Sequence, residues 1–350
     1  MKSYRCFLPV VVVLVLNAVV SVIVLTQNNA SMPFGDSLIL SSNDTGPVVQ
    51  MISLQWPTTW ADDFHNFSVT VASEVSGCEP KLRLRRGTTA FLFKPSSVGK
   101  VMNELIAYHV DQLFGFRRVP PVLLEQVMLS AVEDALLAYR NVTTFKLSCS
   151  MNFVESRERW IIHNHSEKGP VVIGTRQILI PGVRQRSEMD RFVNKHLASG
   201  RLEMTPTIFG QREIDTRSMF QSLLGNWDSF NNDFSVTQSF GTRMDKQMNI
   251  LVYIDNNGLS RNHPVSPPQF CRFYHSVVDS LRSIDDPQKK VLGRILAAEP
   301  LAEIWIERKL IRPQRDLLPL YWINERRRRV LTLVDECIEK FGFHHVFTAQ

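Results

Sequence analysis

The sequence predicts an α+β fold with two lobes, in which the first lobe is mixed and rich in strands and the second is largely helical. Short apolar stretches of strand composition dominate the chain before about residue 175, and apolar residues at helical spacing dominate it beyond the turn at Asp255. This segregation is typical of an α+β protein and does not match the alternating order of a βαβ array. The chain of 350 residues, 44% of them apolar, is long enough for a two-lobed domain with a sizeable core.

The N-terminal region is expected to anchor the chain in a membrane. Phe7–Leu25 is a run of mostly Val, Leu and Ile, close to the roughly 20 residues that span a bilayer core. Basic residues precede it and no charge follows until Asp36, so the positive-inside rule makes residues 1–6 a cytosolic tail. A cleaved signal peptide is the alternative, although its apolar region is usually shorter. Residues 26–55, rich in Ser, Asn and Gly, are expected to form a luminal stem.

Sequons and cysteines agree with a luminal location for the rest of the chain. Sequons of the type Asn-x-Ser/Thr occur at Asn29, Asn43, Asn66, Asn141 and Asn164. The cysteines beyond the apolar run are Cys78, Cys149, Cys271 and Cys337. An even number of cysteines in an oxidising compartment indicates two disulfides, although the spacing leaves all three pairings open. Buried free thiols are the alternative.

The folded domain is expected to cover residues 56–345, with a first lobe of about 56–180. Leu82–Arg85 and Thr89–Phe93 read as a hairpin of short strands. Apolar residues recur at helical spacing over Val98–Phe114, and the glycine that follows is expected to end this helix. Phe116–Val122 contains two prolines and must be extended.

The remaining elements follow from the same patterns. A helix is predicted around Glu125–Ala138, followed by strands at Thr143–Ser148, Trp160–His163 and Val171–Ile173. The second lobe is expected to cover about 181–345. Its predicted helices are Arg217–Leu224, Pro268–Ile284, Gln288–Ala298, Leu301–Lys309 and Trp322–Phe341.

The net charge of +6 is modest and does not indicate a nucleic-acid partner. Basic residues cluster at Arg83–Arg86 and Arg326–Arg329, without interleaved aromatic residues and without a nucleic-acid-binding motif. Such runs usually mark solvated surface, and an anionic ligand or partner is the alternative.

Two aspartates are predicted to lie on short loops. Asp228 ends the segment Gly-Asn-Trp-Asp, and Asp255 follows the buried-strand pattern of residues 250–254 and opens the turn Asp-Asn-Asn-Gly. Phosphoryl transfer needs one carboxylate near the attacking hydroxyl and another that holds Mg²⁺ or Mn²⁺ on the phosphates. The amide of Asn232 could ligate a second metal ion. Ordinary turns rich in Asn and Asp are the alternative.

Lys94 and Glu104 could complete such a site. Lys94 ends the apolar strand pattern Ala-Phe-Leu-Phe-Lys, from which its ammonium could reach nucleotide phosphates. Glu104 lies in the next predicted helix and could hold Lys94 in place, as the lysine–glutamate ion pair of kinases does. Taken alone, each of these residues would more often be an exposed side chain. Together with the two aspartates they predict a kinase.

Motifs of other enzyme classes do not occur. The chain has no G-x-G-x-x-G and no G-x-x-x-x-G-K-[ST] loop, which argues against a standard protein kinase and a P-loop NTPase. It also has no His-Glu-x-x-His, Gly-x-Ser-x-Gly or Cys-x-x-Cys motif. A type II glycosyltransferase would share the anchor and stem, but Asp285-Asp286 does not fit the metal motif expected there.

Several segments carry a family resemblance. Phe93–Pro95, residues 103–111 and the run Gly-Phe-Arg-Arg-Val-Pro-Pro-Val at 115–122 look like the N-lobe signature of the Four-jointed and Golgi casein kinase family of secretory-pathway kinases. The preferences of residues for helices or turns do not account for the run Phe-Arg-Arg-Val-Pro-Pro. Leu224–Asp228 resembles the catalytic-aspartate loop of that family, and Tyr253–Gly258 resembles its metal-binding segment. The resemblance is scattered in blocks and is poor in the middle of the chain.

The resemblance implies an atypical protein-kinase-like two-lobed fold and a division of roles in the site. Lys94 would contact the phosphates of ATP, and Glu104 would be its partner on the helix. Asp228 would be the catalytic base, and Asp255 would hold Mn²⁺ or Mg²⁺. Gly174–Pro181 is more weakly similar to a nucleotide-pocket stretch of the family.

This chain departs from the family pattern at two positions, and the same resemblance implies one disulfide. The family usually has Arg where this chain has Ser229, and Asp233 stands where Asn is common. A loop one residue shorter would restore Asn232 as a metal ligand; otherwise weak activity or a pseudokinase role follows. The closing helix of the family carries a cysteine bonded to one early in the C-lobe, which implies a bridge between Cys271 and Cys337.

The expected protein is therefore a type II Golgi membrane protein with a luminal catalytic domain, which could also be secreted after cleavage. It would phosphorylate Ser/Thr hydroxyls of secreted or cell-surface proteins, including cadherin-like or glycosylated ones. A sugar hydroxyl of a glycan is the second substrate class. The alternative is a pseudokinase that binds and activates a partner kinase. A homodimer, or a heterodimer with another kinase of the family, would be compatible with an active kinase and with a pseudokinase.

Overall fold

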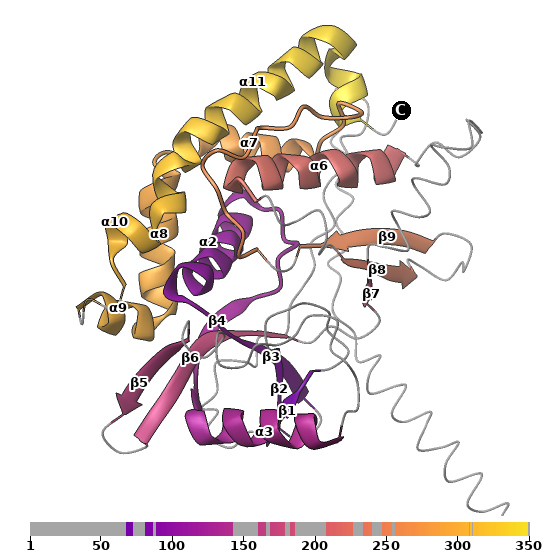
Figure 1. Ribbon diagram of the computed structural model, residues 1–350. Helices are drawn as coiled ribbons and strands as arrows, with labels where there is room; N and C mark the ends of the chain where they lie inside the picture. Colours follow the sequence, from indigo (N-terminus) through magenta and orange to yellow (C-terminus); the bar gives the residue numbers. More distant parts are fainter. Residues whose placement is uncertain are drawn as a thin grey trace, which may run out of the picture. The chain divides into compact units, whose positions relative to one another are not determined.

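Two antiparallel sheets and a set of helices make up the part of the chain that the structure describes (Figure 1). The computed structural model describes residues 68–72, 81–86, 89–142, 160–165, 169–178, 183–185, 208–226, 234–239, 247–253, 256–307, 309 and 311–348. All of them belong to one unit of the chain.

Several sequence-based predictions lie outside these residues. They are the anchor Phe7–Leu25, the stem 26–55, the strand Thr143–Ser148, the cysteines Cys78 and Cys149, and the sequons at Asn29, Asn43 and Asn66. Of the helices that the structure describes, none combines the length and the apolar character needed to cross a bilayer.

The larger sheet has six strands and confirms the predicted hairpin. Its order is β1 (Ser68–Val71), β2 (Leu82–Arg86), β3 (Thr89–Pro95), β6 (Gly169–Ile178) and β4 (Val122–Met128), and β5 (Ile161–His165) also pairs with β6. All of these pairings are antiparallel. Leu82 and Leu84 of β2 are buried while Arg85 is exposed, which is the period of two that a half-buried strand requires. β5 overlaps the strand predicted at Trp160–His163 from Ile161 onward, and β6 contains the strand predicted at Val171–Ile173.

Helix α2 (Val98–Phe114) has the predicted boundaries. It ends at Gly115, whose φ of 77° is left-handed and therefore favours glycine. Val101, Leu105 and other apolar residues at helical spacing are fully buried. The helix packs against β4 and β6 on one side and against α7 (His275–Ser283) and α8 (Pro287–Ala298) on the other, so it joins the sheet to the helical region.

The prediction of a helix around Glu125–Ala138 is wrong at its start. Residues 122–128 form strand β4, and helix α3 covers Leu129–Val142. The backbone of β4 pairs along its whole length with β6, from Val122 opposite Gln177 to Met128 opposite Val171. This long-range pairing overrides the local helical pattern of the sequence.

The prediction of a helix over Pro268–Ile284 is also wrong at its start, because α7 begins only at His275. The carboxylate of Asp215 accepts hydrogen bonds from the backbone N–H groups of Gln269, Phe270 and Arg272. Donors that are satisfied by a side chain have no need of a helical partner, so this segment adopts a non-helical path.

The other predicted helices are present. The remaining elements are α6 (Ile208–Leu224), α9 (Pro300–Glu307), α10 (Pro313–Asp316), α11 (Leu318–Phe347) and a small antiparallel sheet of β7 (Val183–Gln185), β8 (Phe234–Ser239) and β9 (Gln247–Val252). Helix α11 contains the predicted helix Trp322–Phe341 and changes direction at Gly342. It packs against α6, α7 and α8.

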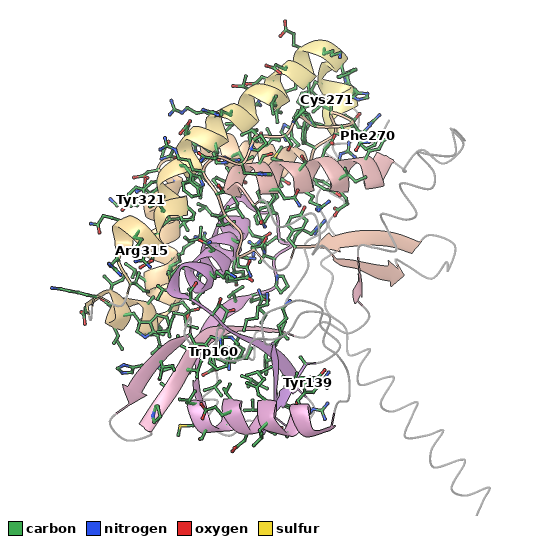
Figure 2. The ribbon with its side chains drawn as sticks, viewed as in Figure 1. Tyr139, Trp160, Phe270, Cys271, Arg315 and Tyr321 are labelled. Carbon is green, nitrogen blue, oxygen red and sulfur yellow. A yellow bond between two sulfur atoms is a disulfide. The ribbon has the colours of Figure 1, made fainter. Side chains whose placement is uncertain are left out.

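A disulfide between Cys271 and Cys337 confirms the pairing that the family resemblance implied. It joins the segment before α7 to α11, with Cα atoms 5.5 Å apart (Figure 2). The two cysteines are separated by 66 positions. Closing a loop of this length reduces the entropy of the unfolded chain by the equivalent of about 4 kcal/mol in the chain-entropy account.

Glu299 is a buried carboxyl group at the C-terminal end of α8. It is 4% exposed, and its Oε2 accepts a hydrogen bond from the backbone N–H of Leu124. Burial raises the pKa of Glu299 to about 8, although this hydrogen bond and the charge of Arg176 act in the opposite direction, while Glu125 raises it further. The folded protein therefore keeps Glu299 protonated at a pH at which the unfolded chain would release the proton.

A pH dependence of stability follows. Because the folded pKa lies above the unfolded one, the stability that the bound proton provides is complete below the unfolded pKa and is lost as the pH rises toward about 8. The loss is at most about 1.4 kcal/mol per pH unit. In urea unfolding at pH 6 and pH 8, we expect the wild-type protein to lose more stability than Glu299→Gln, which is neutral at both values. An equal loss in the two proteins would show that Glu299 is already ionised at pH 6.

Candidate active site

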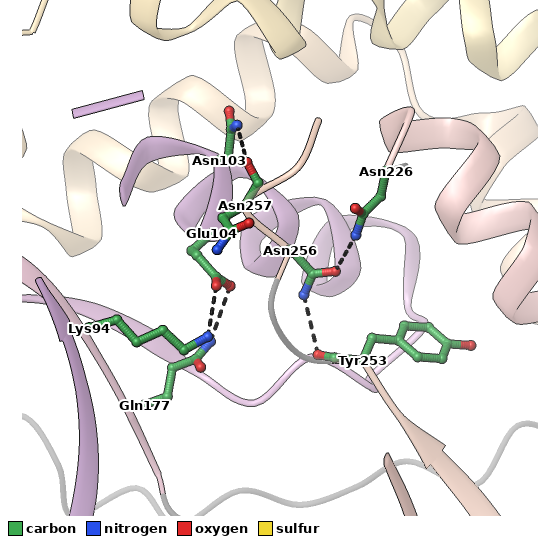
Figure 3. A network of polar contacts seen from close by, with 8 residues as sticks. All are labelled: Lys94, Asn103, Glu104, Gln177, Asn226, Tyr253, Asn256 and Asn257. Atoms are coloured by element: carbon green, nitrogen blue, oxygen red, sulfur yellow. Dashed lines mark hydrogen bonds and ion pairs between the residues drawn. The ribbon is translucent and has the colours of Figure 1, made fainter. Parts of the chain in front are cut away.

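Lys94 and Glu104 form a buried ion pair between β3 and α2. The Nζ atom of Lys94 lies 2.9 Å from Oε1 of Glu104 (Figure 3). Lys94 is 7% exposed and Glu104 is 2% exposed. Strand β3 lies between β2 and β6, so Lys94 is an interior residue of the sheet and not a solvated edge residue. The structure thus brings together the two candidates that it describes.

Gln177 of β6 supports this pair, and the motif analysis did not assign it a role. Its Nε2 donates a hydrogen bond of 3.3 Å to Oε2 of Glu104, so both carboxylate oxygens of Glu104 have partners. In the pairing of β3 with β6, Lys94 lies opposite Thr175, and Gln177 is two positions further along β6. Gln177 therefore projects from the same face of the sheet as Lys94. Its only sequence signal was the weakly similar stretch Gly174–Pro181.

Gly174 allows β3 and β6 to approach each other next to Lys94. A Cβ atom at this position would lie 2.4 Å from the backbone oxygen of Lys94 and 2.8 Å from the ring of Phe93. Both distances are shorter than any ordinary contact, so a side chain would push the two strands apart. Because Gly174 has no side chain, β6 can lie close to the part of β3 from which Lys94 projects.

The loops that carry the two predicted aspartates are joined through their neighbours. Nδ2 of Asn226 donates a hydrogen bond of 3.1 Å to Oδ1 of Asn256, and Nδ2 of Asn256 donates one of 3.3 Å to the backbone oxygen of Tyr253 (Figure 3). Asn226 and Leu259 also form an isolated antiparallel bridge. Asn226 and Asn256 are both buried, so this contact is shielded from water.

The aspartates themselves are not described. Asp228 follows Asn226 by two positions, and Asp255 directly precedes Asn256. Asp228, Asp255 and Asn232 lie outside the residues that the structure describes. Within the described ranges, no group of three or more His, Cys, Asp or Glu side chains could hold a metal ion. The proposed metal ligands therefore remain predictions.

Gly225 and Arg326 hold together the described segments that lie next to Asp228 and Asp255 in the sequence. Gly225 has a φ of 69°, and a Cβ atom on it would lie 2.2 Å from the backbone oxygen of Ser260. The guanidinium of Arg326, on α11, donates to the backbone oxygens of Ser222, Arg261 and His263. Ser222 precedes the Asp228 loop, and the other two follow the Asp255 loop. One buried cation thus binds both segments.

The segment that follows α2 is tied to the Asp255 loop through Arg118. The Oδ1 atom of Asp111 accepts hydrogen bonds from the backbone N–H groups of Arg118 and Val119, at 2.8 and 3.1 Å. The backbone oxygen of Arg118 accepts one from the N–H of Tyr253, at 3.1 Å. Burial raises the pKa of Asp111 to about 7, with the two backbone N–H groups opposing the shift.

The side chain of Arg118 makes a second connection. Its Nη2 lies 2.6 Å from Oε1 of Glu213 on α6, and the hydroxyl of Tyr274 donates to the same carboxylate at 2.7 Å. All three side chains are buried. The run Phe-Arg-Arg-Val-Pro-Pro, which local propensity does not explain, therefore links α2 to both α6 and the Asp255 loop.

The described part of the site fits a phosphate ligand. A buried ammonium held by a carboxylate and an amide is a fixed positive charge of the kind that contacts nucleotide phosphates in kinases. The described neighbours of Asp228 and Asp255 contact each other, and those of Asp255 also contact the helix that carries Glu104. Carboxylate and amide oxygens are the ligands that Mg²⁺ and Mn²⁺ prefer, so the predicted donors suit these ions.

Comparisons with known proteins find the same fold in solved structures. The chain is similar to a crystal structure of the Golgi casein kinase, with a TM-score of 0.53, 13% identity and coverage of 82% of this chain and 77% of that one. A structure of the Golgi casein kinase with Mn/ADP bound gives the same TM-score and coverage at 14% identity. The structure of hydra Fam20 with sugar gives a TM-score of 0.51 at 16% identity, covering 80% of this chain and 88% of that one.

These matches confirm the predicted α+β, two-lobed, kinase-like fold. No protein-family profile and no curated protein matches this chain. At identities of this size the likeness concerns the fold.

Proposed function

We propose that this protein is a kinase of the secretory pathway that transfers the γ-phosphate of ATP to a hydroxyl group. The observation that carries the proposal is the buried ion pair of Lys94 and Glu104 next to the joined loops at Asn226 and Asn256. Removing two charges from water costs several kcal/mol per ion. A buried ion pair therefore does not by itself indicate a gain in stability. A role for the ammonium in binding phosphate accounts for its position.

The predicted residues would divide the work as follows. Lys94 would bind the phosphates, held in place by Glu104 and Gln177. Asp255, with Asn232, would hold Mn²⁺ or Mg²⁺, and this metal ion would neutralise charge on the phosphates when bound. Asp228 would accept the proton of the substrate hydroxyl. The contact between Asn226 and Asn256 supports the convergence of the two aspartates, and the match to a structure with Mn/ADP bound supports the choice of metal and nucleotide.

Ser/Thr hydroxyls of secreted or cell-surface proteins are the proposed substrates, and the likeness to the Golgi casein kinase supports this class. A sugar hydroxyl is the second candidate, because the hydra Fam20 structure was solved with sugar. We place the protein in the Golgi membrane, with Phe7–Leu25 as its anchor and the catalytic domain in the lumen. A pseudokinase that activates a partner kinase, in a homodimer or heterodimer, is the alternative that Ser229 and Asp233 favour.

The proposal is tested with the full chain, expressed in a secretory pathway and purified. We expect it to transfer label from γ-labelled ATP, in the presence of Mn²⁺, to a protein in an extract of secreted proteins. Asp255→Ala should lose this transfer because the metal ion loses a ligand, whereas Asp285→Ala, at an exposed aspartate, should keep it. Asp228→Ala should still bind ATP, as measured by a thermal shift, without transferring phosphate.

The outcomes separate the alternatives. Transfer to glycan rather than to protein would identify a sugar kinase. A wild-type protein that is stabilised by ATP but transfers nothing would be a pseudokinase. A wild-type protein that neither binds ATP nor transfers phosphate would refute the proposed function.

A further inference from the structure

Asn103, which directly precedes Glu104 on α2, contacts the loop of the other predicted carboxylate. Its Nδ2 donates a hydrogen bond of 2.8 Å to the backbone oxygen of Asn257, a residue 154 positions further along the chain (Figure 3). Asn257 follows Asp255 by two positions. The motif analysis gave Asn103 no role of its own.

The geometry of a helix explains how one segment serves both halves of the site. Successive residues of an α-helix project about 100° apart, since a turn contains 3.6 residues. Glu104 projects toward Lys94 on β3, and Asn103 projects toward the turn at Asn257. The backbone between them is held rigidly, because Met102 and Leu105 are completely buried on either side.

The turn around Asp255 is held at several points, and Asn103 supplies one of them from α2. On the side before Asp255, the N–H of Tyr253 binds the backbone oxygen of Arg118. On the side after it, Asn256 uses its amide oxygen for Asn226 and its amide nitrogen for Tyr253. An amide that is engaged at both ends fixes the loop.

We propose that Asn103 is a positioning residue that sets the metal-binding turn relative to the pair of Lys94 and Glu104. This inference rests on the proposed function. The hydrogen bond from Asn103 ties the turn to α2, so the metal-bearing loop and the phosphate-binding lysine share one rigid support. Asn103 itself is half-buried and is not among the buried core residues, so we expect its replacement to leave the core intact.

Two variants remove the donor in different ways. Asn103→Ala deletes the amide, and Asn103→Asp keeps the shape but places a carboxylate oxygen against the backbone oxygen of Asn257. Loss of one neutral hydrogen bond is worth about 1 kcal/mol, or about fivefold in an equilibrium constant. We expect the Kd for Mn²⁺, measured by titration in the presence of ATP, to rise about fivefold in Asn103→Ala and further in Asn103→Asp. The KM for Mn²⁺ in phosphate transfer should rise in parallel, with kcat nearly unchanged at saturating metal.

A matched control makes the same chemical changes elsewhere. Gln314 is an exposed amide on α10, and Gln314→Ala and Gln314→Glu should leave the Kd for Mn²⁺ unchanged. Amide hydrogen exchange of the segment 256–260, measured without metal or nucleotide, gives a second readout. It should be faster in both Asn103 variants than in the wild-type protein, while urea unfolding shows no larger loss of stability than that of one hydrogen bond.

The two proposals fail in different ways. A wild-type protein that binds Mn²⁺ and ATP, with Asn103 variants that match it in metal affinity and in hydrogen exchange, would refute the role of Asn103 alone. A wild-type protein that binds neither Mn²⁺ nor ATP would refute the proposed function and, with it, any metal-positioning role of Asn103.

Discussion

Replacing Lys94 by methionine is expected to reduce phosphate transfer to less than about 1% of the wild-type rate, since loss of one preorganised electrostatic contact typically costs 10²–10³ in kcat. Methionine keeps an apolar stem of similar length but removes the ammonium. Glu104 then remains buried with Gln177 as its side-chain hydrogen-bond partner. Because breaking a buried ion pair leaves a charge without compensation, the variant should also lose about 3–5 kcal/mol of stability. Transfer from labelled ATP measures the loss of activity, and urea unfolding measures the loss of stability.

A double variant separates catalysis from stability. In Lys94→Met with Glu104→Gln, no charge remains buried, and the new amide can still bind Gln177. We expect most of the lost stability to return, because replacing both members of a buried pair by neutral groups is often nearly neutral. Phosphate transfer should stay lost, because the ammonium is still missing. Transfer that recovers together with stability would show that Lys94 acts only through the fold.

The ion pair and its supporting helix could be predicted because their signals are local. The apolar spacing of Val98–Phe114 and the glycine after it fix the boundaries of α2, and Lys94 stands at the end of a plain strand pattern. The resemblance to secretory-pathway kinases then pointed to Glu104 as its partner. The disulfide between Cys271 and Cys337 was implied by the same resemblance.

The later part of β4, from Glu125 to Met128, could not be predicted, because its conformation depends on a distant strand. Residues 122–128 contain Leu, Glu, Gln and Met, which suit a helix in isolation. Pairing with β6 makes them a strand instead. The prediction of a helix for the segment before α7 is wrong for a similar reason. The carboxylate of Asp215 accepts hydrogen bonds from backbone N–H groups more than fifty positions away.

The binding partners of the amides that hold the two loops together could not be predicted from the sequence either. Asn226 binds a residue 30 positions away, and Asn103 binds one 154 positions away. A hydrogen bond between side chains or to a backbone oxygen imposes no regular spacing, whereas a helix or a strand does. The sequence therefore leaves open whether these Asn-rich segments are catalytic loops or ordinary turns. Their contribution to the site, the joining of the loops around Asp228 and Asp255, is seen only in the folded chain.

Among the polar contacts of the described residues, we expect the buried cluster of Arg118, Glu213 and Tyr274 to contribute most to the free energy of unfolding. Arg118 is completely buried, and its ion pair with Glu213 at 2.6 Å joins the segment after α2 to α6. Arg118→Met would leave the carboxyl group of Glu213 buried without the guanidinium of Arg118, with the hydroxyl of Tyr274 as a remaining hydrogen-bond donor. We expect a loss of about 3–5 kcal/mol. For a domain of this size the loss corresponds to a decrease in Tm of about 10 °C.

The neighbouring Arg117 provides the control for this prediction. It lies in the same motif but is exposed, so Arg117→Met should change stability by less than about 1 kcal/mol. The double variant Arg118→Met with Glu213→Gln should recover most of the stability, because no charge is left buried. A Tm for Arg118→Met close to that of Arg117→Met would mean that water reaches Glu213. In that case the Arg118 segment would not be the rigid connection through which α2, α6 and the Asp255 loop are held together.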